Sequence, residues 1–163
     1  MKRKIIKGLF VVYILGLIYV LFLHSPYRFM GNTWNVGIFS KEHIEMANFV
    51  PLRTVSTYFT RLGEHSINTS IVVMNLSVNL LLLAPMAVFV KVLFSNKINK
   101  FWKFLLLILC LNIIIEILQF LTFSGSLDID DIILNTMGAC ITYGIMSIKY
   151  VENFVRKMLK LEE

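Results

Sequence analysis

The chain is poor in charge, proline and cysteine. Only 16% of its 163 residues are charged, and it holds three prolines and two cysteines. It has no CxxC pair or zinc-type Cys/His spacing, no HExxH motif and no GxSxG nucleophile motif. Both cysteines, Cys110 and Cys140, fall in apolar stretches, where a thiol packs as a small apolar group. These absences argue against a disulfide framework, and we expect neither a metal site nor a cofactor.

Apolar sequence is what the chain has in abundance, at 57% hydrophobic residues. A soluble domain of this length would not be so apolar. Crossing a bilayer takes about 20 helical residues. Four stretches are long enough, at residues 5–23, 71–94, 104–123 and 132–148. We therefore expect an all-α polytopic membrane protein: a single domain, 1–163, with four transmembrane helices.

Basic residues are distributed unevenly over the loops of such a bundle. Twelve of the sixteen fall before the first span, around the link between spans two and three, or after span four. Alternating helices place all of these on one side, and the excess of Lys and Arg on cytoplasmic loops then puts both termini in the cytoplasm. The net charge of +6 is thereby a feature of membrane topology, and we expect no nucleic-acid partner. The loop 24–70 lies outside, and 149–163 forms a cytoplasmic tail.

The outer loop contains one helical pattern. Leu52, Val55, Phe59 and Leu62 recur at helical spacing, and Pro51 precedes them as a helix-opening residue. This predicts a short amphipathic helix in the outer interface. It either binds lipid or only packs over the bundle.

Two residues within the spans have expected roles in packing. Pro85 interrupts the second span, removes a backbone donor and frees the carbonyl of Leu81, so we expect a kink there. Gly138 in the fourth span allows close approach of another helix.

Glu116 lies in an otherwise apolar span, where a carboxylate costs roughly 3 kcal/mol. Other polar residues share its depth: Asn79 lies about 12 Å, Glu116 about 10 Å and Asn135 about 5 Å inside the outer ends of their spans. Side chains at one depth on three helices can meet. The full polar set on the three spans is Asn75, Asn79, Asn112, Glu116, Gln119, Asp131, Asn135 and Thr142.

Two simpler explanations compete with a binding site. Asp128 and Asp131 can cap the start of the fourth span, because carboxylates there satisfy free backbone amides. The amide side chains can merely join helices, through hydrogen bonds worth about 0.6 kcal/mol in membranes. That small gain does not explain why Glu116 is acidic where glutamine would serve.

At these residues the chain resembles the VanZ-like family. The matching pieces, which cover Asn48 to about Gly144, are Asn48-Phe-Val-Pro51 with Arg53, Asn79 with Pro85, Glu116-Ile-Leu-Gln119-Phe120, Asp128-Ile-Asp130-Asp131 and Asn135-Thr-Met-Gly138. The chain departs from the family pattern at Ala87 and Thr142, where the family often has glycine. It also lacks the arginine often found before the acidic motif.

The resemblance implies a bacterial envelope protein, since the family's namesake confers resistance to teicoplanin-type glycopeptides in Gram-positive bacteria. The partners expected are the lipid bilayer and a lipid-linked envelope precursor or lipoglycopeptide, and a homo-oligomer is compatible with four helices. The candidate ligand-binding residues are Asn48, Arg53, Asn75, Asn79, Glu116, Gln119, Asp128, Asp131 and Asn135.

Two other classes of function stay open from the sequence. Paired carboxylates could serve an enzyme that acts on envelope lipids, although no catalytic motif is recognisable. Alternatively, Glu116 could carry protons in a small transporter, since an intramembrane carboxylate is a common proton carrier.

Overall fold

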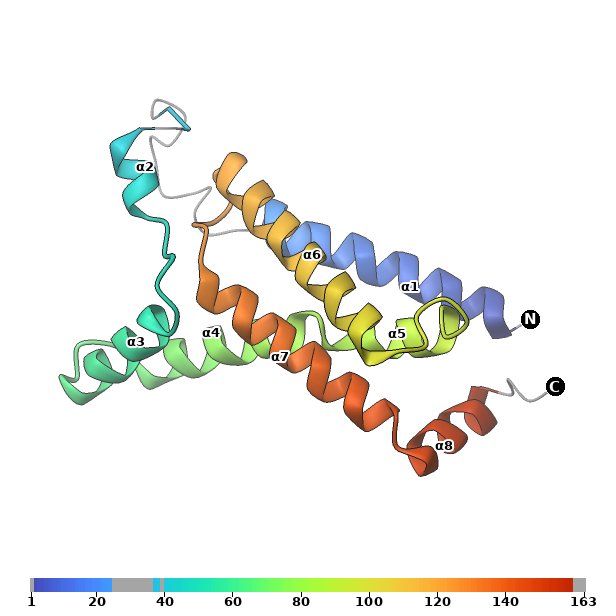
Figure 1. Ribbon diagram of the computed structural model, residues 1–163. Helices are drawn as coiled ribbons and strands as arrows, with labels where there is room; N and C mark the ends of the chain where they lie inside the picture. Colours follow the sequence, from blue (N-terminus) through green and yellow to red (C-terminus); the bar gives the residue numbers. More distant parts are fainter. Residues whose placement is uncertain (1, 25–36, 39, 160–163) are drawn as a thin grey trace.

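The computed structural model describes residues 2–24, 37–38 and 40–159. Within these ranges the regular structure is helical (Figure 1). The helices are α1 (Lys2–Ile18), continued by the π-helical turn η1 (Tyr19–Leu23), then α2 (Lys41–Glu45), α3 (Arg53–Gly63), α4 (Thr69–Leu82), α5 (Ala84–Leu93), α6 (Phe101–Leu121), α7 (Ile129–Met146) and α8 (Lys149–Leu159). Much of the predicted outer loop, 25–36 and 39, and the end of the tail, 160–163, lie outside the described residues.

The predicted all-α membrane fold is confirmed. Among the described residues, three helices are long and apolar enough to cross a membrane: Arg3–Leu23, Thr69–Leu93 and Phe101–Leu121. The fourth predicted span corresponds to α7, which meets the same test only together with Lys149–Val155, from which it is bent by 83°. The ends of the chain lie at one end of the bundle, opposite α2 and α3 (Figure 1).

The second span is broken where the sequence predicts a kink. It consists of α4 and α5, which meet at Leu83, and Pro85 occupies the first turn of α5. Proline lacks the N–H that would continue the ladder of hydrogen bonds. The Tyr13 hydroxyl of α1 donates a hydrogen bond of 2.9 Å to the carbonyl oxygen of Leu82, the last residue of α4. The break is thereby satisfied from a neighbouring helix.

The core of the bundle forms around α7, which packs against α4, α5 and α6. Phe104 of α6 is fully buried and stacks on Tyr143 of α7 with ring centroids 4.3 Å apart. On the outside, by contrast, large apolar side chains such as Val12, Leu81 and Leu106 are more than half exposed. An apolar exterior on this scale is suited to lipid contact rather than to water.

Two amphipathic helices lie beyond the spans. α3 matches the extent of the amphipathic helix that the sequence predicts almost to the residue. α8 was expected only as part of a tail; it is a helix that turns away from α7, with Tyr150 and Phe154 exposed. The helical spacing of Tyr150, Val151, Phe154 and Val155 carries the signal for α8.

Gly138 allows a close helix crossing, as the sequence predicts. A Cβ built on it would lie 1.6 Å from the carbonyl oxygen of Leu80, a backbone atom of α4 that cannot turn aside. A Cβ on Gly144, two turns later on α7, meets nothing within 4 Å. α4 and α7 therefore approach each other at a distance that only glycine permits.

Replacing Gly138 with alanine should separate α4 from α7. We expect Gly138→Ala to lose about 3 kcal/mol or more of the free energy of unfolding, as overpacked cores do. Gly144→Ala is the matched control and should be neutral or slightly stabilising. Thermal unfolding of the two variants in the same detergent measures the difference, and equal stability would contradict the crossing.

Candidate functional site

Asn48 joins the loop that precedes α3 to the turn between α6 and α7. Its backbone N–H donates to the carbonyl of Leu127 (2.7 Å), and its own carbonyl accepts from the N–H of Ile129 (2.9 Å), which makes a short parallel bridge. Its side-chain nitrogen donates to Asp128 Oδ1 (2.8 Å), and its Oδ1 accepts from the N–H of Val50 (3.1 Å). The backbone N–H, the carbonyl and the side-chain nitrogen of this buried residue thus bind the two segments together, and its Oδ1 fixes the local turn at Val50.

Asp128 caps α7, in agreement with one of the two simpler explanations. Its Oδ1 accepts from the N–H of Asp130 (2.8 Å), which satisfies a free amide at the helix start. Its Oδ2 accepts from the Thr54 hydroxyl (2.6 Å), so the same carboxylate also reaches α3. Asp131 does not follow this explanation: its Oδ1 accepts from the Asn79 side chain on α4.

Asp130 holds the beginning of α3. It is 1% exposed, and it accepts hydrogen bonds from the backbone N–H groups of Leu52, Thr54 and Val55. Leu52 has a φ of 64°, in the left-handed region that is strained for residues other than glycine. The carboxylate of Asp130 therefore acts as an N-terminal cap supplied from another helix, and it fixes both the strained turn and the direction of α3.

Glu116, like Asp130, is a buried carboxylate that accepts a hydrogen bond from a backbone N–H. It is 3% exposed, and its Oε2 accepts from the backbone N–H of Asp128 (3.0 Å). One turn earlier on α6, Asn112 donates to the Thr136 hydroxyl of α7 (2.9 Å). Asn79 of α4 and Glu116 of α6 thus both bond to the start of α7, as their common depth predicts, whereas Asn112 and Thr136 meet farther along α7.

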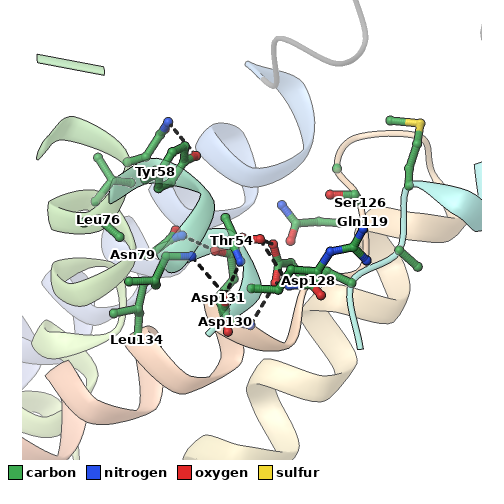
Figure 2. A pocket seen from close by; sticks show the side chains of 18 of the residues that line it. Thr54, Tyr58, Leu76, Asn79, Gln119, Ser126, Asp128, Asp130, Asp131 and Leu134 are labelled. Atoms are coloured by element: carbon green, nitrogen blue, oxygen red, sulfur yellow. Dashed lines mark hydrogen bonds between the residues drawn. The ribbon is translucent and has the colours of Figure 1, made fainter. Parts of the chain in front are cut away.

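A cavity of about 700 Å³ opens beside this network (Figure 2). It lies between the end of α1, the start of α3, α4, and the turn from α6 to α7. Figure 2 shows Asn79 and Asp131 on one side and Gln119 and Ser126 on the other. Its walls include seven of the nine predicted ligand-binding residues: Asn48, Arg53, Asn75, Asn79, Gln119, Asp128 and Asp131. Glu116 and Asn135 lie outside this lining.

The lining residues differ in how many of their polar atoms already form hydrogen bonds within the protein. Asp128 and Asp130 have both carboxylate oxygens occupied by the hydrogen bonds described above. Asp131 has one oxygen in use, and the exposed Arg53 has no side-chain partner among the described residues, in which Lys41 and Glu45 form the only ion pair. Glu45 also lines the cavity but pairs with Lys41, so among the described residues Arg53 and Asp131 are the charged lining groups that have neither an ion pair nor all of their polar atoms in use.

Two amide side chains of the cavity, those of Gln119 and Asn75, each make one hydrogen bond. Gln119 donates to the Leu21 carbonyl at 3.4 Å, a long contact, and Asn75 donates to the Tyr58 hydroxyl at 3.1 Å. Asn135 is buried behind the lining, and its Oδ1 has no hydrogen-bond partner in the described part of the chain. Asn79 and Gln119 can therefore orient a ligand, whereas Asn135 lies too deep to contact it.

Sequence reasoning missed three residues that shape the site. Asp130 belongs to a family-type motif and Thr54 directly follows Arg53 of another, but neither was among the candidates. His43 of α2 stacks on Phe120, at a centroid distance of 4.1 Å, and its Nε2 lies 3.0 Å from the Phe120 carbonyl. The acidic cluster 128–131 was the available signal for Asp130, whereas nothing local to His43 indicates that it docks α2 onto the end of α6.

The comparisons with known proteins give one match. A family model described as VanZ/LLP1 matches residues 10–150. No curated protein and no solved structure matches the chain. The matched range contains the whole polar network and nearly all of the four spans.

Removing the Asp130 carboxylate should release the start of α3. In Asp130→Ala we expect the backbone amides of residues 52–55 to exchange with deuterium at least about tenfold faster, because each hydrogen bond to a charged group contributes roughly 1.5–3 kcal/mol. Asp131→Ala, which removes a neighbouring carboxylate that does not hold α3, should leave those amides protected. Unchanged protection in Asp130→Ala would contradict the capping role.

Proposed function

The chain belongs to the VanZ/LLP1 family, and from that premise we propose that it is a membrane protein of the bacterial envelope whose cavity binds the polar head of a lipid-linked precursor or an amphiphilic glycopeptide of the teicoplanin type. The observation that carries this proposal is the pair of uncommitted charged groups, Arg53 and Asp131, lining one cavity beside the bilayer.

The chemistry of the cavity favours a ligand that carries an anion together with an amine or hydroxyl. The Arg53 guanidinium offers a planar fork of donors to a phosphate or carboxylate. The free oxygen of Asp131 accepts from an amine or hydroxyl, and Asn79 and Gln119 orient the group between them. A volume of about 700 Å³ lies in the range typical of sites for small molecules, and it suits a head group rather than a whole glycopeptide.

The hydrogen-bonded network gives this cavity a fixed wall. Asn48, Asp128 and Asp130 are buried and hold the start of α3 against α7. Arg53 follows the strained Leu52 directly, so the same bonds that fix the turn also fix the backbone from which the Arg53 side chain extends.

The distribution of basic residues supports an outward-facing cavity. The start of α3 and the turn from α6 to α7, which line the cavity, lie at the end of the bundle opposite the termini (Figure 1), where few of the basic residues fall. Cytoplasmic termini would therefore open it toward the outer leaflet, where envelope precursors and glycopeptides meet.

The binding role accounts for Glu116 better than the transporter alternative does. Glu116 accepts a backbone N–H and lies behind the cavity wall, so its contacts support the turn before α7. An enzyme acting on envelope lipids would use the same cavity, and release of a product from such a lipid by the purified protein would favour it over binding alone.

Neutralising Arg53 tests the proposal. Expressed in a teicoplanin-susceptible Gram-positive host, the unchanged protein should raise the concentration of teicoplanin needed to stop growth. Arg53→Gln and Asp131→Asn should each abolish that increase, with binding weakened about tenfold by the loss of one charge-assisted contact.

Arg61→Gln is the matched control, because Arg61 is exposed on the same helix, α3, and does not line the cavity. It should retain protection, and all variants should reach the membrane at equal levels. Equal protection by Arg53→Gln, or no protection by the unchanged protein, would contradict the proposal.

A further inference from the structure

A second cavity, of about 520 Å³, lies at the other end of the bundle, between the beginning of α1 and the end of α5. It is formed by two segments that are about ninety residues apart in the sequence. Its lining consists of Arg3, Lys7, Phe10, Val11, Leu93, Phe94, Asn96 and Lys97. The site proposed above uses none of these residues.

The polar part of this cavity carries positive charge without a counterion. Arg3, Lys7 and Lys97 all line it, and its lining contains no carboxylate. Arg3 and Lys7 are one helical turn apart on α1, a spacing at which like charges repel each other. None of the three forms an ion pair within the part of the chain that the structure describes. An anion bound among these three cations would therefore offset their mutual repulsion, which favours binding.

The rest of the lining is apolar and continues along the membrane-spanning helices. Phe10 packs against Phe94, with ring centroids 5.8 Å apart, and against Phe89 at 5.2 Å. Val11 is 55% exposed on the outer face of α1. Along α1 the cations come first and the apolar side chains follow one to two turns later, so the cavity changes from charged to apolar in the direction that leads into the bilayer.

We propose that this cavity binds an anionic phospholipid. The lipid phosphate lies among Arg3, Lys7 and Lys97, and an acyl chain runs over Phe10 and Val11 toward the hydrocarbon. Basic pockets between transmembrane helices are suited to anionic head groups, to which each nearby Lys or Arg adds attraction. The apolar floor of the cavity, formed by Phe10 and Val11, favours a phospholipid over free phosphate, because only the lipid has an acyl chain that can contact it.

Native mass spectrometry of the full-length protein in detergent tests this site. The probes are phosphatidylglycerol, phosphatidylcholine and inorganic phosphate, each titrated separately. The unchanged protein should retain one phosphatidylglycerol at least about tenfold more tightly than phosphatidylcholine, because the zwitterionic lipid offers no net negative charge to the three cations. Inorganic phosphate should not displace it.

Two triple variants separate this cavity from a general effect of charge. Arg3→Gln with Lys7→Gln and Lys97→Gln removes the three lining cations. Lys4→Gln with Lys100→Gln and Lys149→Gln removes three exposed cations outside the lining. Only the first triple variant should lose the preference for phosphatidylglycerol; an equal loss in both, or no loss in the first, overturns the proposal.

A further variant tests the apolar floor and does not depend on the folding of the first triple variant. Val11→Trp leaves every charge in place and fills space over which the acyl chain would run. It should weaken retention of phosphatidylglycerol by several fold while the helix content stays unchanged. Retention equal to that of the unchanged protein, or full displacement of the lipid by inorganic phosphate, overturns the assignment to a phospholipid.

Discussion

The structure depends on the hydrogen bonds that bind the segment from Asn48 to Val55 to the turn before α7. In this contact, backbone amides from a loop and from two helix starts are satisfied by buried side chains rather than by water. Asp130 alone accepts three of them. Without these bonds α3 would have no fixed start, Leu52 would relax from its left-handed conformation, and the cavity that Arg53 lines would lose a wall. The position of the proposed binding groups is thus a consequence of how a membrane protein satisfies its backbone near the bilayer.

The same contact explains why acidic residues occur at buried positions where apolar residues would carry no desolvation cost. A carboxylate that accepts hydrogen bonds from several N–H groups at a helix start is stabilised by those donors and by the helix dipole. Glu116 and Asp128 each receive an N–H, and Asp128 also receives two side-chain donors. Asp131 is the member of this acidic group that keeps an oxygen for something else. The cluster therefore divides into residues that build the cavity and one that is available within it.

The two ends of the bundle have opposite chemistry. One end gathers carboxylates and amides around a cavity with a single lining arginine, and the other gathers cations above an apolar floor. The first arrangement suits a ligand with mixed charge and hydroxyl groups, and the second suits an anionic head group. Close packing at Gly138 and the Tyr13 contact at the α4–α5 break hold the helices that connect these ends.

The sequence by itself determined the membrane fold, the kink at Pro85, the close crossing at Gly138, the amphipathic helix α3 and the meeting of polar groups from three spans. Each of these follows from apolar length, from backbone chemistry or from periodicity, which are properties of short segments. Only the tertiary structure decided which carboxylate serves which purpose, because Asp128, Asp130 and Asp131 are near neighbours in sequence and differ only in what other segments bring to them. Glu116, expected as a ligand group, instead supports the turn before α7. The contacts of Asn48, Thr54 and His43 span about seventy-five residues or more, and no local pattern specifies an interaction made at that separation.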